Sequence, residues 1–103
     1  MFARVSRFEG INEPTPEVAG AVEERVMPIL EGMTGWLGGM QLVDRAGAKV
    51  LTVSFFDTLE NLQAAEPTFE EMPQRLGDLR DRMGGERTSV ERYEVLGQRF
   101  PSS

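Results

Sequence analysis

The chain has no cysteine and no histidine among its 103 residues. Without cysteine it can form no disulfide, thiolate metal site, iron–sulfur cluster or cysteine nucleophile. Without histidine it lacks the usual metal ligand, the proximal haem ligand and the commonest general base at neutral pH. A Ser-His-Asp triad is therefore excluded, and proton transfer falls to Asp, Glu, Tyr, Lys or Arg. We expect no metal and no cofactor.

Positive charge and long apolar runs are also scarce. Lys and Arg total 11 against 17 Asp and Glu, which gives a net charge of −6 and disfavours nucleic acid and anionic membranes as partners. No apolar run approaches the ~18 residues that a membrane span needs. The segment Met1–Val5 lacks the basic region and longer apolar run of a signal peptide. We therefore expect a cytoplasmic protein with no membrane partner.

Two predicted strands, Trp36–Asp44 and Lys49–Phe56, carry the clearest apolar pattern. Strands of a sheet with one solvent-exposed face alternate apolar and polar residues, whereas these strands are apolar on both faces. The pattern predicts a hairpin covered on both sides, with helices of the same chain on one side and a second subunit on the other. The pair Gly38 and Gly39 predicts a bulge or a close backbone approach in the first of these strands.

Before this hairpin, Phe2–Phe8 alternates loosely and predicts a first strand. Thr15 is then a predicted N-cap, and Pro16 suits the first helical position, where no N–H bond is lost. Apolar residues follow at three- and four-residue spacing, as on one face of a helix: Val18, Val22, Val26, Ile29, Leu30 and Met33. We expect this helix to kink or break near Pro28 and to end at Gly32–Gly35.

After the hairpin, the sequence predicts a helix in two pieces and a final strand. A helix start lies at Thr58, Pro67 is expected to interrupt the helix, and Pro73 to open its longer piece. The segment Thr88–Leu96 predicts a fourth strand. Residues 98–103 predict a frayed tail.

The predicted order is thus strand, helix, strand, strand, helix, strand within a single domain of residues 1–103. This is the ferredoxin-like α+β arrangement, with helices on one face of a four-stranded antiparallel sheet. Because the hairpin is apolar on both faces, the other face needs a cover. Two-fold dimers are the commonest homo-oligomers, so the expected partner is a second copy.

Three stretches carry a resemblance to a known family: Met33–Gly39, Ser54–Glu60 and Tyr93–Val95. With them, the chain resembles dimeric α/β-barrel proteins of the antibiotic-biosynthesis-monooxygenase type along nearly its full length. The resemblance implies a homodimer whose two sheets pack face to face, with a ligand pocket between the sheet and the helices of each protomer. Members include cofactor-free monooxygenases of polycyclic phenols and quinols, haem-degrading enzymes, isomerases and proteins of no known activity.

The residues of the haem-degrading relatives do not match. Those relatives have an Asn on the first strand, a Trp at the end of the third and a His on the following helix. The corresponding places here hold Ser6 or Arg7, Phe56, and the segment Ala65-Glu66. Haem oxygenation is therefore not expected.

The candidate ligand pocket combines aromatic and hydroxyl side chains. Trp36 could stack on a flat ligand or anchor the core, and Tyr93 could donate a hydrogen bond to a phenolate or serve only as a strand residue. Thr52, Ser54 and Phe56 share one strand face, where the hydroxyls could line a pocket or bond to backbone. Ser6 is expected nearby, because the first and third strands are neighbours in this arrangement.

Charged residues on the first and last predicted strands form a second candidate: Arg4, Arg7, Glu91, Arg92 and Glu94. They could clamp an anion or make ordinary cross-strand ion pairs. The acidic residues Asp78, Asp81 and Glu86 show no metal-ligand spacing.

Three hypotheses follow. The first is a dimer that binds a small apolar or aromatic ligand and acts as a cofactor-independent monooxygenase on an aromatic or polyketide-like metabolite. The second is a non-enzymatic ligand-binding or structural dimer, whose pocket is filled by its own Phe and Met side chains. The third is one member of a hetero-assembly that docks by a sheet edge. A connected cavity above ~300 Å³ touching Tyr93 and the Ser54 face would favour a ligand.

Overall fold

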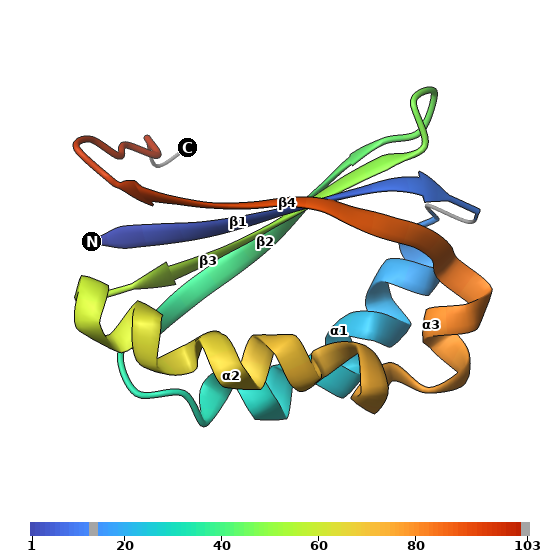
Figure 1. Cartoon of the computed structure of the whole chain (residues 1–103). Coiled ribbons are helices and arrows are strands. Elements are labelled where there is room, and N and C mark those ends of the chain that lie inside the picture. The colour runs from blue at the N-terminus through green and yellow to red at the C-terminus, as the bar shows by residue number, and fades with distance from the viewer. Residues whose placement is uncertain (13–14, 102–103) are drawn as a thin grey trace.

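The computed structural model describes residues 1–12 and 15–101. One antiparallel sheet has the strand order β2-β3-β1-β4, and Figure 1 shows the three helices together on one of its faces. The elements follow the predicted ferredoxin-like order: β1 (Phe2–Ile11), α1 (Pro16–Glu31), β2 (Trp36–Asp44), β3 (Lys49–Phe56), α2 (Leu59–Leu76), α3 (Asp78–Met83) and β4 (Gly84–Glu94). The α+β fold class is therefore confirmed.

The central hairpin has the predicted bounds. The register shifts between Trp36 and Gly38, next to the glycine pair where a bulge or a close backbone approach was predicted. The outer parts of the sheet are longer than predicted. Strand β1 continues past Phe8 to Ile11, and β4 begins at Gly84. These extensions pair with each other, since Ile11 lies opposite Gly84. Backbone pairing thus extends both strands into polar sequence that lacks a strand pattern.

Helix α1 begins as the sequence predicts. The Thr15 hydroxyl accepts a hydrogen bond from the Val18 amide at 3.3 Å, and Pro16 occupies the first turn. The helix runs through Pro28 without a break and ends at Gly32. Because Pro28 lies in the last turn, it removes one hydrogen bond close to the end of the helix, where the loss matters least.

The second helix is split, but at a different place from the one predicted. Helix α2 runs unbroken through both Pro67 and Pro73 to Leu76. The break falls at Gly77, whose φ of 53° is one that a residue with a side chain rarely adopts. The side chain of Thr58 caps the start of α2 by accepting a hydrogen bond from the Asn61 amide at 3.1 Å.

Two apolar clusters join the helices to the sheet and to each other. One links α1 to α3 through Val18, Val22 and Leu79. The other lies under α2, where Phe56 and Leu62 are both 0% exposed and Phe2, Trp36 and Phe69 pack around them. The ring of Phe69 meets that of Phe56 edge-on, with centroids 6.2 Å apart.

Candidate functional site

Three polar side chains are buried between the sheet and α2, beside the Phe56 cluster. Arg4 is 4% exposed, Ser6 2% and Ser54 9%. Arg4 lies opposite Ser54 and Ser6 lies opposite Thr52 in the pairing of β1 with β3. Paired residues share a face of the sheet, so these four side chains form one polar group on the helix-covered face. Burying such groups is costly unless they are hydrogen-bonded.

Arg4 is the centre of this group. Its Nε donates to Glu66 of α2 at 3.1 Å, and its Nη1 donates to the Ser6 hydroxyl at 2.8 Å. The Phe69 ring lies over the guanidinium, 4.0 Å from its carbon to the ring centroid, an arrangement that favours a cation. Burial lowers the pKa of Arg4 below its ordinary value, and the Glu66 carboxylate opposes that change.

One nitrogen of the Arg4 guanidinium makes no hydrogen bond to the described residues. Its Nη2 is buried with no hydrogen-bond partner among the described residues, and Glu70 Oε1 lies 4.0 Å away as an ion-pair partner. The Trp36 indole nitrogen is likewise buried and unpartnered in the described part of the chain. Buried donors without partners are uncommon in native proteins. These two donors could therefore serve a bound molecule.

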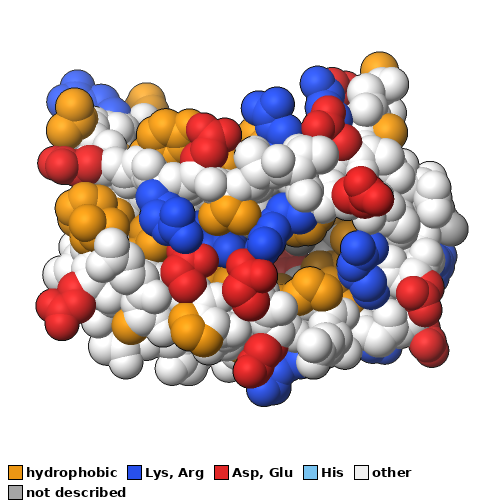
Figure 2. All heavy atoms as spheres, viewed as in Figure 1, with side chains coloured by type: hydrophobic (Ala, Val, Ile, Leu, Met, Phe, Trp, Pro, Cys, Tyr) orange, Lys and Arg blue, Asp and Glu red, His pale blue; other side chains and the backbone are white. Residues whose placement is uncertain are grey.

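A row of charges continues outward from Arg4. Arg92 of β4 contacts Glu66 at 2.9 Å, and Arg87 of β4 contacts Glu70 at 3.0 Å. Figure 2 shows Lys and Arg side chains above Asp and Glu side chains along the seam between β4 and α2, with a hollow beside them. The Arg87 guanidinium also lowers the pKa of Glu70 through its hydrogen bond.

Five of the six predicted pocket residues share the helix-covered face: Ser6, Trp36, Thr52, Ser54 and Phe56. Tyr93 does not join them. It lies opposite Ala3 in the register of β1 with β4, whereas Ser6 lies opposite Val90, so Tyr93 points to the other face. Its hydroxyl donates to Glu91, which raises the pKa of Tyr93 above 10.0. Within one chain, Tyr93 cannot line the same pocket as Ser54.

The predicted charged group also divides between the faces. Arg4 and Arg92 are paired across β1 and β4, as expected of neighbouring strands, but both contact Glu66 on a helix rather than a residue on the opposite strand. Arg7 lies on the other face. The sequence pattern did not predict Glu66, Glu70 or Arg87 as members of this group. Glu66 and Glu70 are four residues apart and therefore lie on the same face of a helix. Without the sheet register, nothing placed them opposite Arg4.

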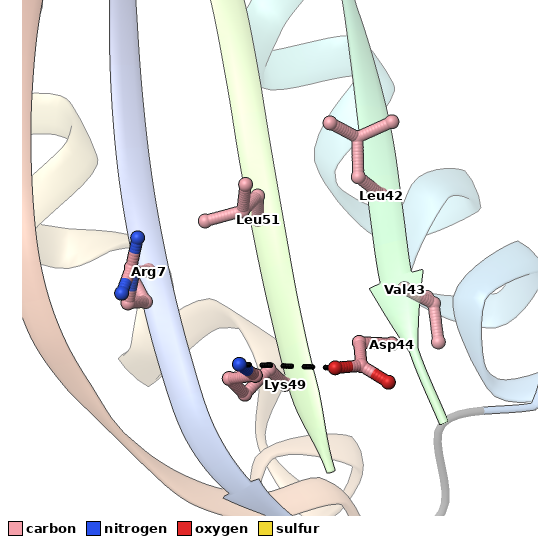
Figure 3. Close-up of a pocket in the computed structure, with 6 residues that line it drawn as sticks. All are labelled: Arg7, Leu42, Val43, Asp44, Lys49 and Leu51. Atoms are coloured by element: carbon pink, nitrogen blue, oxygen red, sulfur yellow. Dashed lines mark ion pairs between the residues drawn. The ribbon is translucent and has the colours of Figure 1, made fainter. Parts of the chain in front are cut away.

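The sheet face without helices is apolar, as the hairpin pattern predicted. Alternation and register place there Val5, Met40, Leu42, Leu51, Val53, Phe55 and Tyr93. Met40 is 40% exposed and Leu42 47%. A hollow of about 210 Å³ near the hairpin end is lined by Leu42, Leu51 and Arg7 (Figure 3). Lys49 and Asp44 also line it and form an ion pair at 3.7 Å.

A second hollow, of about 580 Å³, lies between α1 and α2 and is lined in part by Ile29, Met33, Ala64 and Thr68. Neither hollow is lined by Ser6, Ser54 or Tyr93. Across residues 1–12 and 15–101, no group of three acidic side chains is arranged to hold a metal ion. No helix in that part of the chain is long and apolar enough to cross a membrane.

No family model matches the sequence. Two curated relatives do, and both are uncharacterized proteins of Mycobacterium tuberculosis: MT2634 of strain CDC 1551 / Oshkosh and Rv2557 of strain H37Rv. Each is 29% identical over 98 residues, which covers 92% of this chain and 41% of the relative. The chain thus spans about two-fifths of the length of the curated relatives that it matches.

Several solved structures share the fold of this chain. The monooxygenase from the ActVA-Orf6 gene of Streptomyces coelicolor, solved with nanaomycin D, is 19% identical with a TM-score of 0.64, covering 98% of this chain and 92% of that one. The cofactor-independent oxygenase SnoaB of Streptomyces nogalater is 15% identical with a TM-score of 0.60, over 98% and 97%. A dimeric ferredoxin-like protein from an uncultured marine organism is 11% identical with a TM-score of 0.64, over 97% and 98%.

These structures, each less than 20% identical to this chain, show its fold. The chain has the ferredoxin-like fold that antibiotic-biosynthesis-monooxygenase-type proteins share, as the sequence resemblance indicated.

Proposed function

We propose that the protein is a small-molecule-binding homodimer that acts as a cofactor-independent monooxygenase on an aromatic or polyketide-like metabolite. The observation that carries this proposal is a pair of buried donors in and beside the polar group beneath α2 that lack hydrogen-bond partners. Arg4 Nη2 and Trp36 Nε1 are buried donors without hydrogen-bond partners in the described residues. A ligand with oxygen acceptors would satisfy them.

The chemistry needs only the substrate and O₂. The substrate anion, formed by loss of a proton from a CH₂ group beside a phenol ring, forms a carbon–oxygen bond with O₂. Protonation gives a hydroperoxide, whose O–O bond breaks as water leaves with the second hydrogen of that carbon. One oxygen atom becomes a carbonyl and the other becomes water. Arg4, Ser6 and Ser54 would stabilise the anion in a water-poor site, where such donors act most strongly.

The dimer is supported by the apolar sheet face. Val5, Leu51 and Val53 lie at its centre, and Arg7 and Glu91 lie on the same face with opposite charges. A second copy related by a two-fold axis presents the same surface, so apolar centres can meet while opposite charges pair. The fold neighbour described as dimeric agrees with this arrangement.

Oxygen uptake with a dihydroxyanthrone tests the activity. The protein, stripped of metal with a chelator, is expected to consume one O₂ per anthrone faster than a heat-denatured sample does. Ser54→Ala, which removes one buried donor, is expected to slow this uptake by about tenfold, the usual scale for one hydrogen bond to a charged group. Uptake no faster than the denatured control would reject the monooxygenase.

One observation favours the second candidate, a non-enzymatic dimer with a self-filled pocket. The interior beneath α2 is occupied by Phe56, Leu62 and Phe69. The hollows of about 210 Å³ and about 580 Å³ lie elsewhere. Titration with aromatic compounds, followed by Trp36 fluorescence, tests this candidate. If no compound binds and no oxygen is taken up, the non-enzymatic dimer is favoured.

A further inference from the structure

We infer that the site beneath α2 takes a ligand with one negative charge, an aromatic carboxylate, and that Arg4 Nη2 donates to the carboxylate. This inference rests on the proposed ligand site and names the chemical class that it accepts. Two independent features of the charged group carry it: one donor has no hydrogen-bond partner, and the charges do not balance.

Arg4 Nη2 is placed to donate a hydrogen bond to a ligand. Arg4 has two of its three nitrogens engaged, with Nε on Glu66 and Nη1 on Ser6, and the side chain is 5% exposed. The remaining nitrogen, Nη2, is buried without a hydrogen bond in the described part of the chain. Glu70 stands 4.0 Å from it, which is too far for a hydrogen bond.

The charge count points to a single anion. The group contains three arginines and two glutamates, joined by the contacts Arg4–Glu66, Arg4–Glu70, Arg87–Glu70 and Arg92–Glu66. It therefore carries one positive charge in excess. A guanidinium matches the planar oxygens of a carboxylate, and its charge would compensate that of a monoanion.

The aromatic character of the proposed ligand follows from the side chains that surround Arg4. The Phe69 ring covers the guanidinium, and Phe56 and Trp36 belong to the same cluster. Figure 2 shows a hollow beside the charged seam of β4 and α2. Glu70, 56% exposed at the outer end of the group, is the carboxylate that a ligand would compete with for Arg4.

Isothermal titration of the full chain with naphthoate, at about 0.15 M ionic strength, tests the inference. Naphthoate is expected to bind, and the neutral analogue naphthalenemethanol to bind at least about tenfold more weakly, because it lacks the charged acceptor. Glu70→Gln removes the competing charge and is expected to tighten naphthoate binding about two- to fivefold. The matched control is Glu71→Gln, one residue further along α2 and 63% exposed, which should leave the affinity unchanged.

Arg4→Lys keeps the charge but loses the planar fork, and is expected to weaken naphthoate binding about tenfold or more. Equal affinities for naphthoate and naphthalenemethanol would overturn the inference while leaving a ligand site in place. No tightening in Glu70→Gln would also overturn it, even if Arg4→Lys does not fold. Oxygen uptake is measured separately, so naphthoate binding without oxidation of the anthrone would reject only the monooxygenase.

Discussion

Arg4 on β1 and Glu66 on α2 are 62 positions apart in the sequence and meet at 3.1 Å between Nε and Oε1. This contact fixes α2 over the sheet, because it joins a strand in the middle of the sheet to the middle of the longest helix. It also gives the buried Arg4 cation a carboxylate within hydrogen-bond distance, whereas its other ion-pair partner, Glu70, lies 4.0 Å away.

Glu66→Gln should therefore destabilise the fold. We expect the free energy of unfolding to fall by about 2 kcal/mol, since Arg4 and Arg92 both lose a charged acceptor. Urea denaturation followed by circular dichroism measures this. Glu71→Gln is the control on the same helix, where an exposed ion pair should contribute less than about 0.5 kcal/mol. Equal stabilities of the two variants would show that the buried contact contributes little.

Two glycines should respond to alanine in opposite directions. At Gly35, φ is +80° and an added Cβ would clash with Asp57 Oδ1, so Gly35→Ala should destabilise the fold by about 2 kcal/mol or more. At Gly20, within α1, an added Cβ meets no atom within 4 Å, and Gly20→Ala should stabilise the fold by about 0.5–1 kcal/mol.

Thermal unfolding of the Gly35 and Gly20 variants beside the parent protein is the measurement. A melting temperature that rises for Gly35→Ala would contradict the left-handed backbone at that position. One that falls for Gly20→Ala would contradict the open helix face of α1.

Tyr93 should ionise at a higher pH than a solvent-exposed tyrosine without such a partner. Its hydrogen bond to Glu91 favours the protonated phenol and raises the pKa of Tyr93 above 10.0, although Arg7 opposes the shift. The unfolded chain therefore releases this proton first, and the contribution of Tyr93 to stability is lost as the pH rises above about 10.

Ultraviolet titration of the phenolate tests this shift. Glu91→Gln should move the titration of Tyr93 to lower pH, because it removes the negative charge beside the hydroxyl. Phe55→Leu, on the same sheet face, is the control and should leave the midpoint in place. An unchanged midpoint in Glu91→Gln would show that Glu91 does not control this phenol.

The apolar sheet face should decide the oligomeric state. Val53→Glu places a charge at the centre of that face, and burying it unpaired would raise the dimer dissociation constant by about a hundredfold or more. Light scattering after size exclusion should show a dimer for the parent protein and a monomer for this variant. Gln63→Glu, on the exposed side of α2, should remain dimeric. A parent protein that is monomeric at all concentrations would remove the barrel and favour a hetero-assembly.

Local signals in the sequence were sufficient for most of the elements. Thr15 and Pro16 start a helix through interactions within one turn, and the hairpin strands are defined by their own apolar pattern. The sequence misplaced the break in the second helix because proline was taken as a helix breaker at Pro67 and Pro73. Leu62, Ala65 and Phe69 pack into one cluster on either side of Pro67, and such tertiary packing favours a helix that continues past this proline.

The sequence by itself determined the order of strands and helices, the apolar character of the hairpin strands and the exclusion of histidine and cysteine chemistry. These follow from residue type and from periodicity over a few neighbouring positions. Only the tertiary structure decided that Tyr93 lies on the opposite face from Ser54, and that Glu66 and Glu70 meet Arg4. Such relationships depend on strand register and on how a helix lies across a sheet, and both are set by contacts between residues far apart in the chain.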